Sequence, residues 1–178
     1  HPIVKDRLSD IKSIKIKTHE SAIRIISKVG PLNNPADRDH CLQYMIAVPL
    51  AFGNLTAEHY EDEFHHSNPI IDALREKMTV EEEPRYTTEY LESEKRSIAN
   101  SLQVVFKDGS VTDEIEINYP VGHRRRREEG IPLLEEKFMT NLLTVFTKDR
   151  CKAIYDLCKD QEKLENTRVN DFMDLFIP

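Results

Sequence analysis

The chain has 178 residues, with 25 basic and 32 acidic side chains and a formal net charge of −7. This length suits one ordinary domain that buries a substantial core. The acidic balance argues against nucleic-acid binding driven by overall charge, and no apolar run approaches the roughly 20 residues that span a membrane. We therefore expect neither nucleic acid nor a membrane as a partner.

Alternating apolar residues and turn residues predict a small, mostly antiparallel sheet. Strands are expected over residues 11–18, 78–80, 101–106 and 111–119. If Asp108-Gly109 forms a two-residue hairpin loop, Leu102 pairs with Ile115 and Phe106 with Val111, so that apolar residues share one face.

Helical periodicity, N-cap residues and prolines predict the remaining elements. Helices are expected over residues 20–28, 35–52, 56–63, 69–74, 132–146, 148–159 and 170–176. The second of these is apolar on nearly every side, so it should be buried, with Pro49 as a kink. Residues 81–96 and 122–130 are expected to be charged loops. The pattern predicts an α+β fold in one domain, 1–178, with helices packed on one side of the sheet.

The stretch from Gly30 to Tyr44 carries the first candidate site. On one continuous helix, His40 and Tyr44 are i, i+4 neighbours and Gln43 lies three residues after His40, so they project into one region with Arg38 close by. A phenol and an imidazole there could move protons or bind carboxylate oxygens. The alternative is that these polar groups satisfy one another in the core.

The run from Arg124 to Arg127 follows His123 and carries the second candidate. Arginine binds carboxylates bidentately, so one or two of these side chains could clamp a polyanion. The alternative is a solvated loop, because Glu128 and Glu129 follow at once. The pair His65-His66 is expected to be exposed. No Cys/His spacing is typical of a zinc site, and the three cysteines favour a reducing compartment.

Longer segments support a more specific hypothesis. They are Gly30-Pro-Leu-Asn-Asn-Pro-Ala-Asp-Arg-Asp-His40 with Gln43-Tyr44, Ile70 to Lys77, Glu94 to Asn100, Tyr119 to His123, Gly130 to Pro132, Glu136 to Phe138 and Val169 to Leu175. Together they closely resemble the C-terminal portion of the MmgE/PrpD family. The resemblance covers essentially the whole chain.

The resemblance implies a fold and an activity. It implies the smaller α+β domain of a protein whose active site lies in a cleft against a larger helical domain. It implies a hydro-lyase that converts 2-methylcitrate to 2-methyl-cis-aconitate in propionate breakdown, with no cofactor and no metal. The 178-residue chain by itself is expected to be inactive. Alternatives are a cis-aconitate decarboxylase-like member of the same family and a non-catalytic module that binds an anion or a partner.

The resemblance also implies roles for particular residues. A related decarboxylase branch has a similar His-x-x-Gln-Tyr segment whose tyrosine lines the active site. Carried over, this gives Tyr44 and His40 as catalytic residues, with Arg38, Gln43, His123 and Arg124 as substrate-binding residues. The implied partners are a tricarboxylate substrate, the helical domain of the same polypeptide and a second copy in a homodimer. The location would be mitochondrial in a fungus, which we favour, or cytoplasmic in a bacterium.

Overall fold

The computed structural model describes all 178 residues. Its residues group into two compact units, His1–Pro120 and Val121–Pro178. The expectation that residues 1–178 form one domain therefore stays a prediction. No helix of the chain is both long and apolar enough to cross a membrane.

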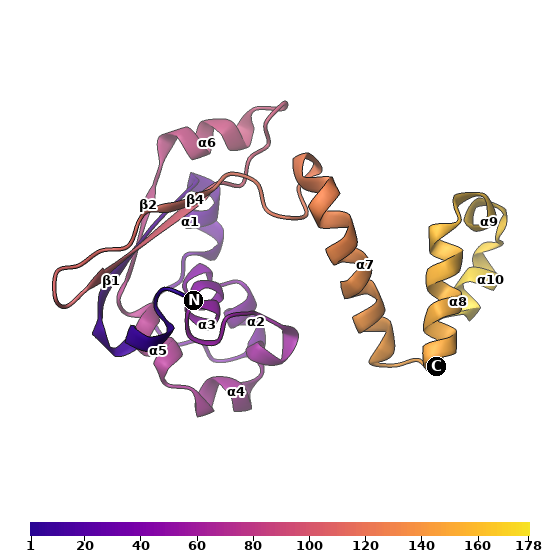
Figure 1. Cartoon of the computed structure of the whole chain (residues 1–178), viewed down its shortest axis with the longest axis horizontal. Helices are drawn as coiled ribbons and strands as arrows, with labels where there is room; N and C mark the ends of the chain where they lie inside the picture. The colour runs from indigo at the N-terminus through magenta and orange to yellow at the C-terminus, as the bar shows by residue number, and fades with distance from the viewer. The chain divides into compact units, whose positions relative to one another are not determined.

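The first unit contains the only sheet and most of the helices (Figure 1). Its elements are η1 (Lys5–Asp10), β1 (Ile11–Thr18), α1 (Glu20–Ile26), α2 (Pro35–Asp39), α3 (Leu42–Phe52), η2 (Ala57–Tyr60), α4 (Asp62–Ser67), α5 (Ile70–Arg75), β2 (Met78–Glu82), α6 (Pro84–Leu91), β3 (Asn100–Phe106) and β4 (Ile115–Ile117). The strand order is β2-β1-β3-β4. Only the pair β1–β2 is parallel, so the predicted mostly antiparallel sheet and the α+β class are confirmed.

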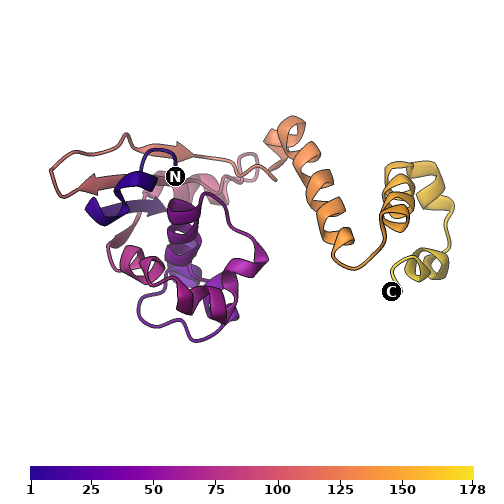
Figure 2. The same cartoon turned by 60° about the horizontal axis from the view of Figure 1, so that its bottom comes forward.

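The core of this unit lies between one face of the sheet and the helices α3 and α5 (Figure 2). Isoleucines 14 and 16 of β1 are buried because they alternate with lysines that face solvent. They pack with Val104 of β3, Val48 of α3 and Leu74 of α5. The expected burial of the apolar helix after Cys41 is confirmed for most of its length.

Helix α6 falls within the segment that we expected to be a charged loop. Glu83 caps this helix by accepting a hydrogen bond from the backbone N–H of Arg85, and Pro84 occupies its first turn. The hydroxyl of the buried Tyr86 donates to Glu116, at 2.7 Å. Glu116 alternates with the two isoleucines of β4, so helices are not confined to one face of the sheet.

The hairpin between β3 and β4 confirms one predicted pair and corrects the other. Leu102 lies opposite Ile115, as expected, but Val111 bridges Val105 rather than Phe106. The N–H of Phe106 donates to the carbonyl of Ser110 and that of Gly109 to the carbonyl of Phe106, with Gly109 at φ +86°. The loop therefore contains a left-handed glycine and an extra residue, which shifts the register next to it by one.

The predicted helix over residues 35–52 is interrupted. Helix α2 ends at Asp39, and α3 begins at Leu42. Between them Cys41 is fully buried and extended, with φ −124° and ψ 108°. Because the backbone is not helical there, the i, i+4 relation between His40 and Tyr44 does not hold.

The second unit is helical. Its elements are η3 (Arg124–Arg126), α7 (Arg127–Leu143), α8 (Lys148–Lys159), α9 (Gln161–Asn166) and α10 (Val169–Asp174). A small core of Leu142, Cys151 and Ile154 holds it together. The expected loop over residues 122–130 is wrong beyond His123, because η3 and the first turn of α7 occupy most of it.

Candidate functional site

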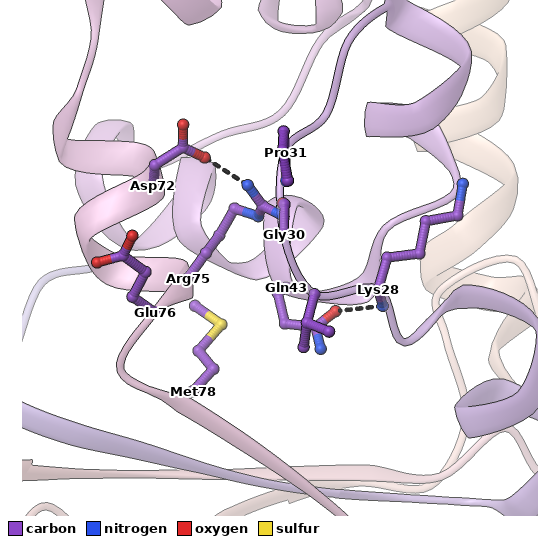
Figure 3. Close-up of a pocket in the computed structure, with 9 residues that line it drawn as sticks. Lys28, Gly30, Pro31, Gln43, Asp72, Arg75, Glu76 and Met78 are labelled. Atoms are coloured by element: carbon purple, nitrogen blue, oxygen red, sulfur yellow. Dashed lines mark hydrogen bonds and ion pairs between the residues drawn. The ribbon is translucent and has the colours of Figure 1, made fainter.

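A pocket of about 500 Å³ opens beside the loop that follows α1 (Figure 3). We call it the Gly30 pocket, after the start of the sequence stretch that carried the family resemblance. Lys28, Val29, Gly30, Pro31, Gln43, Asp72, Arg75, Glu76 and Met78 line it. Its volume lies within the range of small-molecule sites in proteins.

Two buried side chains fix the loop that forms one wall of the pocket. The guanidinium of Arg75 donates to the carbonyl of Gly30, at 2.9 Å, and also to Asp72. The side-chain amide of Gln43 accepts from the N–H of Lys28, at 3.1 Å, and donates to the hydroxyl of Ser27, at 3.0 Å. The wall is therefore held from both α3 and α5, which makes the pocket a preformed feature.

Charges of both signs surround the pocket. Lys28 and Arg75 supply two cations, and Asp72 and Glu76 supply two carboxylates. Both oxygens of Asp72 are engaged, one by Arg75 and the other by His65 at 3.0 Å. Such a lining can hold a polar ligand that carries both a carboxylate and a hydrogen-bond donor. No three His, Cys, Asp or Glu side chains are arranged to hold a metal ion.

Tyr44 and Arg38 are fully buried and hold the segment before α4. The hydroxyl of Tyr44 donates to the carbonyl of His59, at 2.6 Å. Arg38 donates to the carbonyl of Tyr60, at 2.6 Å, and pairs with Asp62. Burial raises the pKa of Tyr44 to about 12, so the phenol stays protonated at neutral pH.

The structure separates the remaining predicted site residues. Gln43 lines the Gly30 pocket, whereas His40 follows the last residue of α2 and its side chain is 64% exposed beside Asp39. Arg38, Gln43 and Tyr44 come from neighbouring turns but have different surroundings. The expected convergence of these side chains on one region is therefore wrong, because the backbone at Cys41 is extended rather than helical. Their roles in a reaction stay predictions.

His123 and Arg124 belong to the second unit. The Nδ1 atom of His123 accepts from the N–H of Arg125, at 3.1 Å, and so caps η3. The residues from Arg124 to Glu129 line a pocket of about 420 Å³.

Sequence reasoning missed three residues that build the Gly30 pocket or adjoin it. His65, expected to be exposed, is only 8% exposed, and its ring lies 5.6 Å from that of Tyr44. Burial is the main reason why its pKa is lowered. Asp72 and Arg75 lie within a segment of the family resemblance, and their i, i+3 spacing was the available signal for a buried ion pair.

The fold and the pocket define an α+β unit with a preformed polar site, joined in sequence to a helical unit. The family model of the MmgE/PrpD C-terminal domain matches residues 1–161. The chain belongs to this family.

The chain is similar to curated proteins from bacteria and fungi. It is 54% identical over 168 residues to a 2-methylcitrate dehydratase of Cupriavidus necator, covering 94% of this chain and 34% of the relative. The identity is 48% over 169 residues to a 2-methylcitrate dehydratase of Escherichia coli K12, covering 95% and 35%. It is 51% over 168 residues to "2-methylcitrate dehydratase, mitochondrial" of Yarrowia lipolytica, covering 94% and 32%. The chain thus spans about a third of the length of these relatives.

Proposed function

We propose that this chain is the C-terminal portion of a 2-methylcitrate dehydratase. The observation that carries the proposal is the 48–54% identity across 94–95% of the chain to three proteins with that name. The product would be 2-methyl-cis-aconitate. The rest of the active site would come from a helical domain of the same polypeptide, which corresponds to the length that the relatives have in addition. For a fungal source, the name of the Yarrowia relative supports a mitochondrial location.

The reaction sets the chemical requirements of the site. Elimination of water removes a proton from carbon and expels a hydroxyl group, so it needs a base and an acid. Three carboxylates of the substrate also need cations or hydrogen-bond donors. In this proposal Tyr44 and His40 are catalytic, and Arg38, Gln43, His123 and Arg124 contribute to binding the substrate, which requires that the full-length protein bring together side chains that are separate in this chain.

Tyr44 is assigned the proton-donating role. A phenol with a pKa of about 12 is protonated at neutral pH, so it suits an acid for the departing hydroxyl rather than a base. To act, the hydroxyl must exchange the carbonyl of His59 for the substrate oxygen. This requirement makes Tyr44 the sharpest residue to test.

The test uses the full-length protein and follows the new carbon–carbon double bond of the product in the ultraviolet. Tyr44→Phe should lower kcat by roughly 10²–10⁴-fold. It should also lower the free energy of unfolding by about 1–3 kcal/mol, because the carbonyl of His59 loses its donor. Tyr60→Phe is the matched control, since its ring stacks on Tyr44 at 5.9 Å, and it should leave kcat unchanged.

Two results would contradict the proposal at different levels. A normal kcat in Tyr44→Phe beside lowered stability would show that the tyrosine only supports the core. A full-length protein that releases CO₂ from cis-aconitate and does not dehydrate 2-methylcitrate would instead be a decarboxylase-like member of the family.

A further inference from the structure

An apolar groove of about 520 Å³ lies in the first unit, between the sheet and the helices α1 and α3. We call it the β4 groove, because the edge strand β4 forms one side of it. Isoleucine, leucine, methionine and alanine side chains of three strands and two helices make up most of its lining. It shares no lining residue with the Gly30 pocket.

The floor of the groove becomes more exposed from the centre of the sheet to its edge. Ile16 of β1 lies opposite Leu102 of β3, and Leu102 lies opposite Ile115 of β4, so these side chains form one row across the sheet. Ile16 is 1% exposed, Leu102 is partly buried and Ile115 is 50% exposed. Ile117, on the same side of β4, is 49% exposed. On this face the helices therefore cover β1 and stop short of β4.

The polar side chains in the groove are engaged within the unit. The hydroxyl of Ser101 donates to Glu114 at 2.6 Å, and the side-chain amide of Asn100 donates to the carbonyl of Ile98 at 3.1 Å. The Nδ1 atom of His19 caps α1 by accepting from a backbone N–H. Small-molecule sites combine apolar walls with a few polar groups that orient the ligand. Because these polar groups hold the unit together instead, the groove suits an apolar protein surface rather than a polyanion.

The shape of the groove narrows the class of protein that fits it. In a symmetric dimer a surface meets its own copy, so two hollow grooves would face each other and stay unfilled. A helix placed beside α3 would instead extend the helical layer over β4 and bury the apolar face of that strand.

The relatives indicate where such a helix comes from. The chain spans about a third of their length, so about two-thirds of a protein of that length lies outside residues 1–178. A segment of the same polypeptide has a high effective concentration at the groove, which favours it over a separate partner.

We propose that the β4 groove is the docking site for a helix from the part of the polypeptide outside residues 1–178. Apolar side chains of that helix would cover Ile115 and Ile117. The inference rests on the part of the proposed function that places this chain in a longer polypeptide, and it does not depend on the reaction.

The first test measures the accessibility of the groove in the full-length protein. Ile115→Cys and Ile117→Cys each place a thiol there, and mass spectrometry follows its labelling by iodoacetamide in the native protein and in urea. Native labelling should be at least roughly tenfold slower than labelling of the unfolded protein, because the thiol reacts only when the contact opens. Leu91→Cys is the matched control, since Leu91 is 64% exposed on α6 and outside the groove. Its two labelling rates should be similar.

The second test identifies the occupant by photo-crosslinking. Ile98 lines the groove and is 43% exposed, so benzoylphenylalanine at this position should react with whatever lies in it. We expect a crosslinked peptide from outside residues 1–178, in a product with the mass of one polypeptide.

Several outcomes would overturn the proposal. They are native labelling of positions 115 and 117 at a rate close to that of the unfolded protein, equal protection of position 91, a crosslink to residues 121–178 or to a second copy, and no crosslink at all. If the full-length protein dehydrates 2-methylcitrate while any of these is observed, the docking site fails and the proposed function stands. If the groove is covered as expected but the full-length protein does not dehydrate 2-methylcitrate, the opposite holds.

Discussion

Replacement of Arg38 by methionine probes the most deeply buried charge of the first unit. The side chain of Arg38 has no exposed surface, while its partner Asp62 is 59% exposed. Without Arg38, the carbonyl of Tyr60 loses a hydrogen-bond donor that lies at 2.6 Å. The carbonyl of Leu32 loses a weaker donor, which lies at 3.4 Å. Methionine fills much of the same volume, so the loss is chiefly polar.

The contacts give the size of the effect. Breaking a buried ion pair commonly costs about 3–5 kcal/mol, but the half-exposed Asp62 regains water when Arg38 is lost. The main cost is then the unsatisfied carbonyl of Tyr60, about 1–3 kcal/mol, with a smaller contribution from Leu32. We expect a total of about 2–4 kcal/mol, which lowers Tm by roughly 10 °C in a unit of this size.

Urea unfolding followed by tyrosine fluorescence is the assay. The chain has no tryptophan, and every tyrosine except Tyr155 lies in the first unit, so the signal reports that unit. Asp62→Asn keeps an acceptor oxygen for Arg38, so it should lower the free energy of unfolding clearly less than Arg38→Met does. A change within about 0.5 kcal/mol for Arg38→Met would match an ordinary surface substitution and would refute the reasoning. Equal losses in the two variants would show that the charge pair, not the carbonyls, dominates.

Two further predictions concern Gly130 and His65. Gly130→Ala places a Cβ on the carbonyl of Val121 and should destabilise the start of α7 by about 1–3 kcal/mol, measured by hydrogen exchange. Gly122→Ala, which meets no atom, is the control, and equal exchange in both variants would contradict the overlap. Burial lowers the pKa of His65, as do Arg38, His66 and Arg75, while Asp72 opposes them. The unfolded chain therefore binds more protons, and stability should fall as pH drops below about 6.5 until the folded pKa is passed. His65→Gln should flatten that slope in urea titrations, leaving the part due to His19, whose pKa is lowered too. An unchanged slope would show that His65 does not titrate as a buried group.

The sheet was largely predictable because its signals are local. Alternation in β1 and the turn residues before β4 identify strands without reference to the rest of the molecule. The register beside Gly109 was not predictable in the same way, because an Asp-Gly pair is compatible with both a two-residue and a three-residue loop. The choice between them depends on how the paired strands twist.

The candidate site was less predictable because it depends on burial. No glycine or proline separates α2 from α3 in the sequence, so the break between them, where Cys41 is buried in the core, has no local signal. His65 lies among acidic residues in the sequence, so its position beneath Asp72 and against Tyr44 carries no local signal. Side chains that meet from three separate helices can be placed only when the tertiary structure is known.

The central strand β1 pairs with no strand close to it in the sequence. Ile14 lies opposite Met78 on one side and Val104 on the other, so both partners are synthesised long after β1. Pairings of this kind close large loops and form slowly, which leaves an apolar strand exposed during synthesis. Lys12 and Lys15 lie between its buried isoleucines and are exposed, and the half-exposed Lys17 follows the last of them. In the nascent chain these charges would oppose the stacking of one β1 segment on another, and so limit aggregation before the sheet is complete.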